Sequence, residues 1–161
     1  MTALTFNNLG CYYKKVKKPK VAYRYMLKAL ELEEQCDLPE SHLASTKLNI
    51  CAILSSMSKH TEAVQYANSA CSDLIEALKL IKIKCLPDDK MNRAIEHFSV
   101  NLKKLAHADP GNRPLLHQTL SIAYYNLAVE FEYIQNFEEA MKTYSKAKYF
   151  ANLTGNFSFV T

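Results

Sequence analysis

The stretch Phe6-Asn-Asn-Leu-Gly-Cys-Tyr-Tyr13 returns in altered form at two later places in this chain of 161 residues. It aligns with Lys47-Leu-Asn-Ile-Cys-Ala-Ile-Leu54 and with Tyr124-Tyr-Asn-Leu-Ala-Val-Glu-Phe131. The alignment makes three asparagines equivalent, at separations of 41 and then 77 residues: Asn8, Asn49 and Asn126. Two sets of alanines keep the same separations: Ala22, Ala63 and Ala140, and Ala29, Ala70 and Ala147. Agreement among these sets indicates an internal repeat.

Each unit of the repeat reads as a hairpin of two helices. Apolar side chains recur at helical spacing along residues 2–16, and a second apolar stripe follows Pro19, a residue that the first turn of a helix accommodates without losing a hydrogen bond. Small residues stand where the paired helices should approach closely: Gly10, Cys51 and Ala128 on the first helices, and Ala22, Ala63 and Ala140 on the second. Bulky neighbours fill the remaining space, as dense packing requires, so we predict an all-α fold.

The length suits a single domain over residues 1–161, and the repeat divides it. We expect a first repeat over 2–36, a second over 40–85 and a third over 114–153, followed by a tail over 154–161. The spacing between the second and third units exceeds 41 by 36 residues, and apolar positions there predict an extra helix over 88–107. A degenerate fourth repeat is the alternative. The apolar tail Phe157-Ser-Phe-Val-Thr161 fits either a partner contact or further repeats after it.

Composition excludes several classes of protein. With only 3 Gly and 5 Pro, the chain has too few turn-forming residues for the many turns of an all-β fold. Its 5 cysteines include no C-x-x-C pair, which favours a reduced, cytoplasmic protein. We expect no secretory signal and no membrane-spanning helix, because lysines or acidic residues interrupt every apolar run.

The net charge of +4 is modest, but the basic residues cluster between the two helices of the first unit. The cluster consists of Lys14, Lys15, Lys17, Lys18, Lys20 and Arg24. One interpretation is a solvated turn, and the other is a patch that attracts an acidic segment of a partner protein. We expect neither a nucleic-acid nor a membrane partner.

No pattern predicts catalysis, a metal or a cofactor. The 5 histidines are scattered, with no H-E-x-x-H pair and no metal-ligand spacing, and 3 isolated glycines build no phosphate loop. The acidic pairs Glu33-Glu34 and Glu138-Glu139 fall at helix ends or turns. We therefore expect a protein that is not an enzyme.

The repeat resembles the tetratricopeptide family, whose signature is W-x2-L-G-x2-Y…A-x3-F. The first unit matches at Phe6, Leu9, Gly10, Tyr13, Ala22, Met26 and Ala29. The third matches at Tyr124, Leu127, Ala128, Phe131, Ala140, Tyr144 and Ala147. The second departs most, with Lys47 and Ala67 at two positions that are usually aromatic. The spacing of 41 is similar to the longer kinesin-light-chain or nephrocystin variety, and the combination also looks like repeat arrays of cytoskeletal and ciliary proteins of protists.

The resemblance implies a right-handed superhelical stack of hairpins, with about seven helices in this chain. It also implies a scaffold that holds an extended peptide or a partner helix in a concave groove lined by the first helices. The groove residues that follow are Asn7, Asn8, Lys14, Asn49, Tyr125, Asn126 and Tyr133. The repeated asparagines either grip a peptide backbone or bond within the stack.

The residues at the groove positions exclude one function found in this family, the binding of chaperones. Chaperone-binding repeats carry Lys or Arg beside the asparagines, whereas this chain has Asn7 and Cys11 in the first unit and Tyr125 and Val129 in the third. We expect this scaffold to belong to a cytoskeletal or ciliary (basal-body) assembly. The alternative is a self-associating structural module of a larger assembly, and a homo-oligomer fits that alternative.

Overall fold

The predicted all-α stack of helical hairpins is confirmed by the structure, a computed structural model that describes residues 2–36 and 40–154. Within these ranges there is no strand, and eight α-helices stand where about seven were expected. Their bounds are α1 Ala3–Lys15, α2 Pro19–Gln35, α3 Glu40–Ser56, α4 His60–Lys84, α5 Asp88–Phe98, α6 Leu102–His107, α7 Arg113–Tyr133 and α8 Phe137–Leu153, with a short 3-10 helix, η1, at Pro110–Asn112. The expected apolar tail, Phe157-Ser-Phe-Val-Thr161, lies outside the described residues.

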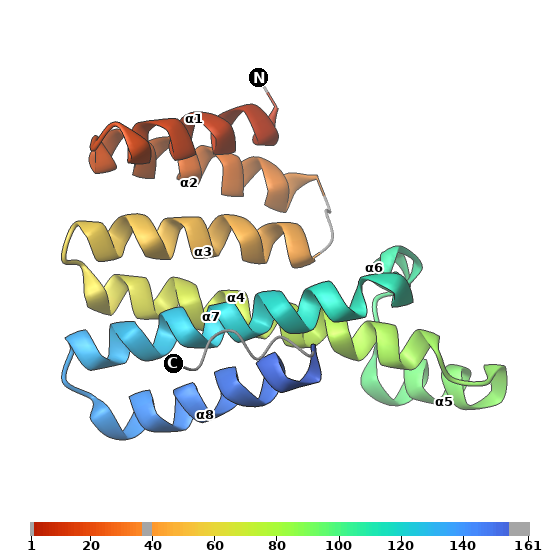
Figure 1. Ribbon diagram of the computed structural model, residues 1–161. Helices are drawn as coiled ribbons and strands as arrows, with labels where there is room; N and C mark the ends of the chain where they lie inside the picture. Colours follow the sequence, from red (N-terminus) through yellow and green to blue (C-terminus); the bar gives the residue numbers. More distant parts are fainter. Residues whose placement is uncertain (1, 37–39, 155–161) are drawn as a thin grey trace.

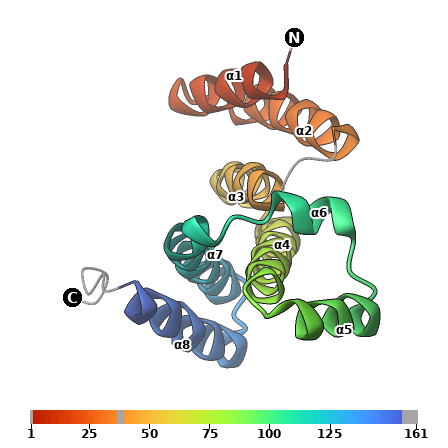
Figure 2. The same cartoon turned by 90° about the vertical axis from the view of Figure 1, so that its right-hand side faces the viewer.

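Three hairpins stack side by side: α1 with α2, α3 with α4, and α7 with α8. The second helix of each hairpin packs on the first helix of the next, because α2 contacts α3 and α4 contacts α7. In Figure 1 the first helices α1, α3 and α7 lie in front, with α2 and α4 behind them. Figure 2 shows the same stack end on, with α5 and α6 set to one side.

The close approach within each hairpin occurs at the small residues. Gly10 is buried on α1, and a Cβ added there would lie 2.8 Å from both Cε and Cγ of Met26 on α2. The equivalent residues of the other first helices, Cys51 and Ala128, are also buried. Their partners on the second helices are buried too: Ala22, Ala63 and Ala140. All three hairpins therefore bury their small residues, and at Gly10 the α1–α2 contact leaves no room for a side chain.

The three hairpin turns share one conformation. Lys17, Ser58 and Gln135 have φ values of 57°, 56° and 60°, in the left-handed region. In each turn the following N–H donates to a carbonyl five residues earlier: Lys18 to Tyr13 at 2.9 Å, Lys59 to Leu54 at 3.0 Å, and Asn136 to Phe131 at 2.9 Å. This is the Schellman ending of a helix. The left-handed residues are again 41 and 77 apart, so the turns keep the register of the repeat.

A glycine at one of these turns should stabilise the protein. Gln135→Gly removes the steric cost of a side chain at positive φ, which exceeds the added entropy of the unfolded chain. We expect the free energy of unfolding to rise by about 0.5–1 kcal/mol, measured by urea denaturation.

The control for this prediction is Gln65→Gly, at an exposed position inside α4. A glycine there should lower the free energy of unfolding by about 1 kcal/mol. If both variants lose stability equally, the Gln135 turn carries no strain of this kind.

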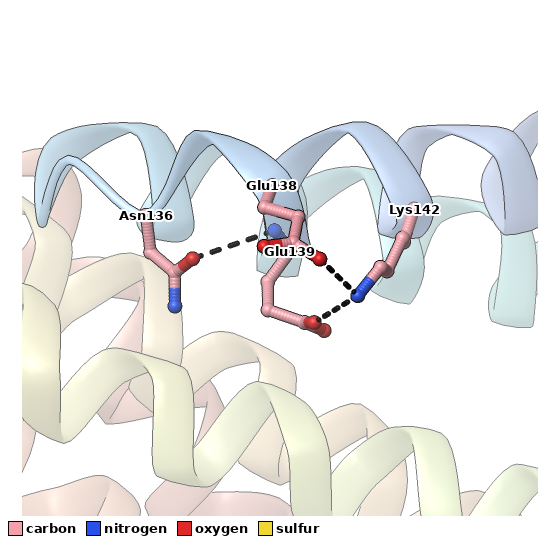
Figure 3. A network of polar contacts seen from close by, with 4 residues as sticks. All are labelled: Asn136, Glu138, Glu139 and Lys142. Carbon is pink, nitrogen blue, oxygen red and sulfur yellow. Dashed lines mark hydrogen bonds and ion pairs between the residues drawn. The ribbon is translucent and has the colours of Figure 1, made fainter.

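The start of α8 is fixed by short-range polar contacts (Figure 3). The Asn136 side chain accepts a hydrogen bond from the backbone N–H of Glu139 at 3.4 Å. Lys142 Nζ lies 2.8 Å from Glu138 and 2.9 Å from Glu139. Acidic residues in the first turn suit the helix dipole, while the exposure of these ion pairs limits their contribution to stability.

The single extra helix expected over residues 88–107 is wrong: the structure has two helices, α5 and α6. Ser99 adopts the left-handed conformation with φ 49° and ψ 47°, which ends α5. Asn101 then starts α6, since its side chain accepts hydrogen bonds from the N–H groups of Lys103 and Lys104 at 3.0 and 3.3 Å. Capping by this asparagine competes with a continuous helix.

This insert, residues 85–112, lies beside the stack rather than within it. Both α5 and α6 contact α4, whereas α7 packs on α4 as the next first helix of the stack. Leu105 of α6 is buried against Leu80 and Ile83, in the last turns of α4. The unusual length of α4, 25 residues, therefore supplies the surface on which the insert rests.

Candidate binding groove

A cavity of about 470 Å³ opens among the first helices of all three hairpins. Its walls include Asn7 of α1, Thr46 of α3 and Leu115 of α7. Glu33 of α2 and Leu74 of α4 also line it. The cavity lies toward the N-terminal halves of α1, α3 and α7, the helices that lie in front in Figure 1.

A smaller cavity of about 230 Å³ adjoins the first, because Ser41, His42, Leu115 and Leu116 line both. It extends to the insert, where Lys104 and His107 of α6 form part of its wall. We call the two adjoining cavities the α1–α3–α7 groove. The insert thus lengthens a groove that the stack alone would end at α7.

Glu33 is the charged residue most deeply placed in this groove. It is 6% exposed, and its Oε1 accepts a hydrogen bond from Thr46 Oγ1 at 3.0 Å. Its other oxygen, Oε2, is buried and has no hydrogen-bond partner among the residues that the structure describes. Burial raises the pKa of Glu33, while the Thr46 hydrogen bond and the nearby His42 act in the opposite direction.

Sequence reasoning placed Glu33 at a helix end but missed its burial. The residue does lie in the last turn of α2, yet it continues the buried face formed by Met26, Ala29 and Leu30. The signal was present in the sequence, because Glu33 follows Ala29 by four positions and Leu30 by three. An acid on an apolar stripe is more informative than an acid beside another acid.

Removing the charge of Glu33 should stabilise the free protein above acidic pH. A folded-state pKa above the ordinary 4.5 means that the folded state holds its proton longer, so wild-type stability falls as pH rises from about that value through the raised pKa. Glu33→Gln lacks this fall. We expect it to be about 1 kcal/mol more stable than wild type at pH 7, with the difference vanishing at low pH, measured by urea denaturation across pH.

Glu34→Gln is the matched control, since Glu34 is the exposed neighbour on the same helix. Its stability should follow wild type at every pH. A Glu33→Gln profile parallel to wild type would contradict the assignment of this pH dependence to Glu33.

Two of the predicted groove residues, Asn7 and Asn49, lie together. Asn49 Nδ2 on α3 donates to Asn7 Oδ1 on α1 at 3.3 Å, so the two amides join neighbouring first helices. Asn7 lines the larger cavity of the groove. For Asn49 the structure thus has a bond within the stack. Asn8 is exposed on α1.

Tyr125 and Asn126 lie at a different cavity, between α7 and α8. This cavity of about 560 Å³ is mainly apolar, and Tyr125 packs edge-on against Tyr144 at 5.6 Å. Phe137 and Met141 of α8, 62% and 72% exposed, leave further apolar surface on this hairpin. Of the repeated asparagines, Asn126 lines this cavity, Asn49 is bonded within the stack and Asn8 is exposed on α1.

Tyr133 lies at the other end of α7 from the groove. Its ring stacks on His60 of α4, with ring centres 4.1 Å apart and planes 7° apart. His60 Nδ1 is 2.8 Å from Oε2 of the buried Glu130. Although Tyr133 is 61% exposed, these contacts tie it to the α4–α7 interface.

The basic cluster lies at the turn between α1 and α2. All six side chains are exposed: Lys14, Lys15, Lys17, Lys18, Lys20 and Arg24. Lys14 follows Asn7 by seven residues along α1, so the cluster and the groove lie toward opposite ends of that helix.

The described residues offer little reactive chemistry. All five cysteines lie in the described ranges and none forms a disulfide; burial raises the pKa of Cys51 and of Cys71 to about 12, so both thiols stay protonated and inert. Within these ranges no group of three or more His, Cys, Asp or Glu side chains could hold a metal ion. In the same part of the chain, no helix combines the length and hydropathy needed to cross a bilayer.

Comparison with known proteins agrees with the geometry. The family model for the tetratricopeptide repeat matches residues 3–36 and 122–152. The first segment holds α1 and α2, and the second holds most of α7 and α8. A search of curated proteins finds no match to this chain. The matches confirm the predicted resemblance to tetratricopeptide repeats, which generally mediate protein–protein interaction on a fold that is typically non-catalytic.

Proposed function

We propose that the chain is a non-enzymatic scaffold module that binds an extended peptide or a partner helix in the α1–α3–α7 groove. The observation that supports this most directly is the cavity of about 470 Å³ in this groove, whose walls include residues from the first helices of all three hairpins. A ligand lying there would contact every unit of the stack at once. The lining of this cavity combines polar side chains with leucines, and polar groups placed in this way can fix the orientation of a ligand.

The proposed contacts start from the residues inside the groove. Asn7 lines it, and Asn49 holds the Asn7 amide in place. For a longer ligand we also propose contacts on the same first helices, α1 and α7, where side chains are at least partly exposed: Asn8, Lys14, Tyr125, Asn126 and Tyr133.

Blocking the groove should abolish peptide binding. Leu115 is 60% exposed and lines both cavities, so Leu115→Arg would fill the groove without disturbing the core. Peptides selected on the wild-type chain from a random phage-displayed library supply the probe. We expect Leu115→Arg to weaken their affinity at least tenfold, about 1.4 kcal/mol, in fluorescence anisotropy.

Tyr149→Arg is the control, because Tyr149 is equally exposed but lines none of the three cavities described above. It should bind as wild type does. The proposal fails if the wild-type chain selects no peptides, or if Leu115→Arg binds them unchanged.

Self-association is the second candidate, and the exposed apolar surface of the third hairpin favours it. Phe137 and Met141 are exposed on α8, and a mainly apolar cavity of about 560 Å³ lies between α7 and α8. Apolar surface of this kind commonly marks a contact with another protein.

Light scattering tests this second candidate. If the chain self-associates through α8, its mass should rise with concentration, and Met141→Glu should return it to the monomer mass because a buried carboxylate at the contact is costly. A wild-type mass that stays monomeric at all concentrations counts against self-association.

The basic cluster and the cellular setting complete the proposal. We propose that the exposed lysines between α1 and α2 attract an acidic segment of the partner, since clustered like charges speed the encounter with an opposite charge. We further propose a cytoplasmic module of a cytoskeletal or ciliary assembly. This setting rests on the repeat spacing of 41, which is similar to the longer kinesin-light-chain or nephrocystin variety.

A further inference from the structure

Glu33 is left with half of its hydrogen bonding unmet. Thr46 satisfies Oε1, but Oε2 is buried and unpartnered among the described residues. A carboxylate taken out of water is stable only when it is paired and hydrogen-bonded, so this oxygen lowers the stability of the free protein. Such an exception in a native fold calls for a physical explanation.

No permanently charged cation lines the cavity beside Glu33 within the described part of the chain. Among the described residues that line the cavity there is no lysine or arginine, and His42 is the other ionisable group. The remaining walls are apolar, hydroxyl or amide side chains, including Leu4, Leu74 and Leu116. A permanent positive charge in this cavity would therefore come from a ligand.

We propose that Glu33 recognises a lysine or arginine side chain of the peptide bound in the α1–α3–α7 groove, an inference that rests on the proposed function. The leucine walls would pack against the methylene stem of the side chain while its charged head meets the carboxylate. An ionised donor and acceptor make a hydrogen bond about twice as strong as a neutral pair. Binding requires a rotation of the terminal torsion, which is soft in glutamate, to bring Oε2 to the ligand.

In the register of the repeat, the first hairpin has an acid at the position of Glu33, whereas the other two hairpins have apolar residues there. The residues equivalent to Glu33 are Leu74, which follows it by 41 positions, and Ala151, which follows Leu74 by 77 positions. Leu74 lines the same cavity, so the acid of the first hairpin faces an apolar residue at the equivalent place in the second. The groove therefore selects a basic residue at one point along the ligand.

The experiment is an array of nine-residue peptides that are randomised except at the centre, where Lys, Arg, Gln, Leu or Glu is fixed. Wild type, Glu33→Gln and the exposed-neighbour control Glu34→Gln are applied to the same array. We expect wild type and Glu34→Gln to bind the Lys and Arg sets roughly tenfold more strongly than the Gln, Leu and Glu sets. Glu33→Gln should lose this preference while its thermal unfolding temperature stays at or above that of wild type.

The outcomes separate the inference from the function on which it rests. Two results would overturn the role of Glu33 but not the proposed peptide binding. In the first, Glu33→Gln keeps the preference for Lys and Arg. In the second, wild type has no such preference, while Leu115→Arg still abolishes its peptide binding. Absence of any wild-type binding overturns the proposed function together with it. Free lysine or arginine is added as a competitor: displacement of the peptides at equal concentration would show a site for the free amino acid and contradict recognition of a peptide side chain.

Discussion

The stack depends on close contact between the two helices of each hairpin. Gly10, Cys51 and Ala128 let each first helix approach its partner, and Gly10 is so near Met26 that a single added carbon would collide with it. These residues recur in register, and the second helix of each of the first two hairpins packs on the first helix of the next. The shared groove exists because the three first helices are held in this common arrangement.

Much of the stack could be predicted from the sequence because its determinants are local and repeated. The apolar stripes, Pro19 and the small residues each act within one hairpin, so their spacing specifies the hairpin. The break between the two helices of the insert could not be predicted in this way. The apolar spacing continues from Phe98 to Leu102 across Ser99, but the backbone turns at Ser99 and the Asn101 cap starts a new helix. Hydrophobic spacing does not record such a break.

The candidate site was predicted less completely, because it depends on contacts between hairpins. Asn7 was assigned to the groove, but its bond with Asn49 arises only when α1 and α3 are stacked. The equivalence of Asn49 and Asn126 in sequence did not make their surroundings equivalent, since α3 has a hairpin on each side, whereas one side of α7 meets only its own partner, α8, among the described helices. Glu33 shows the same limit: its position on the apolar stripe was visible, while its unpartnered oxygen is a property of the assembled cavity.

The separate anchoring of the insert gives the molecule two levels of local stability. Three buried side chains, Leu80, Ile83 and Leu105, form its own small cluster, apart from the main core. A segment opens at a free-energy cost set by the contacts it buries, so we expect α5 and α6 to open at a lower cost than the three hairpins. Lys104 and His107 of this segment line the smaller cavity. The end of the groove at the insert therefore rests on fewer buried side chains than the end at Glu33.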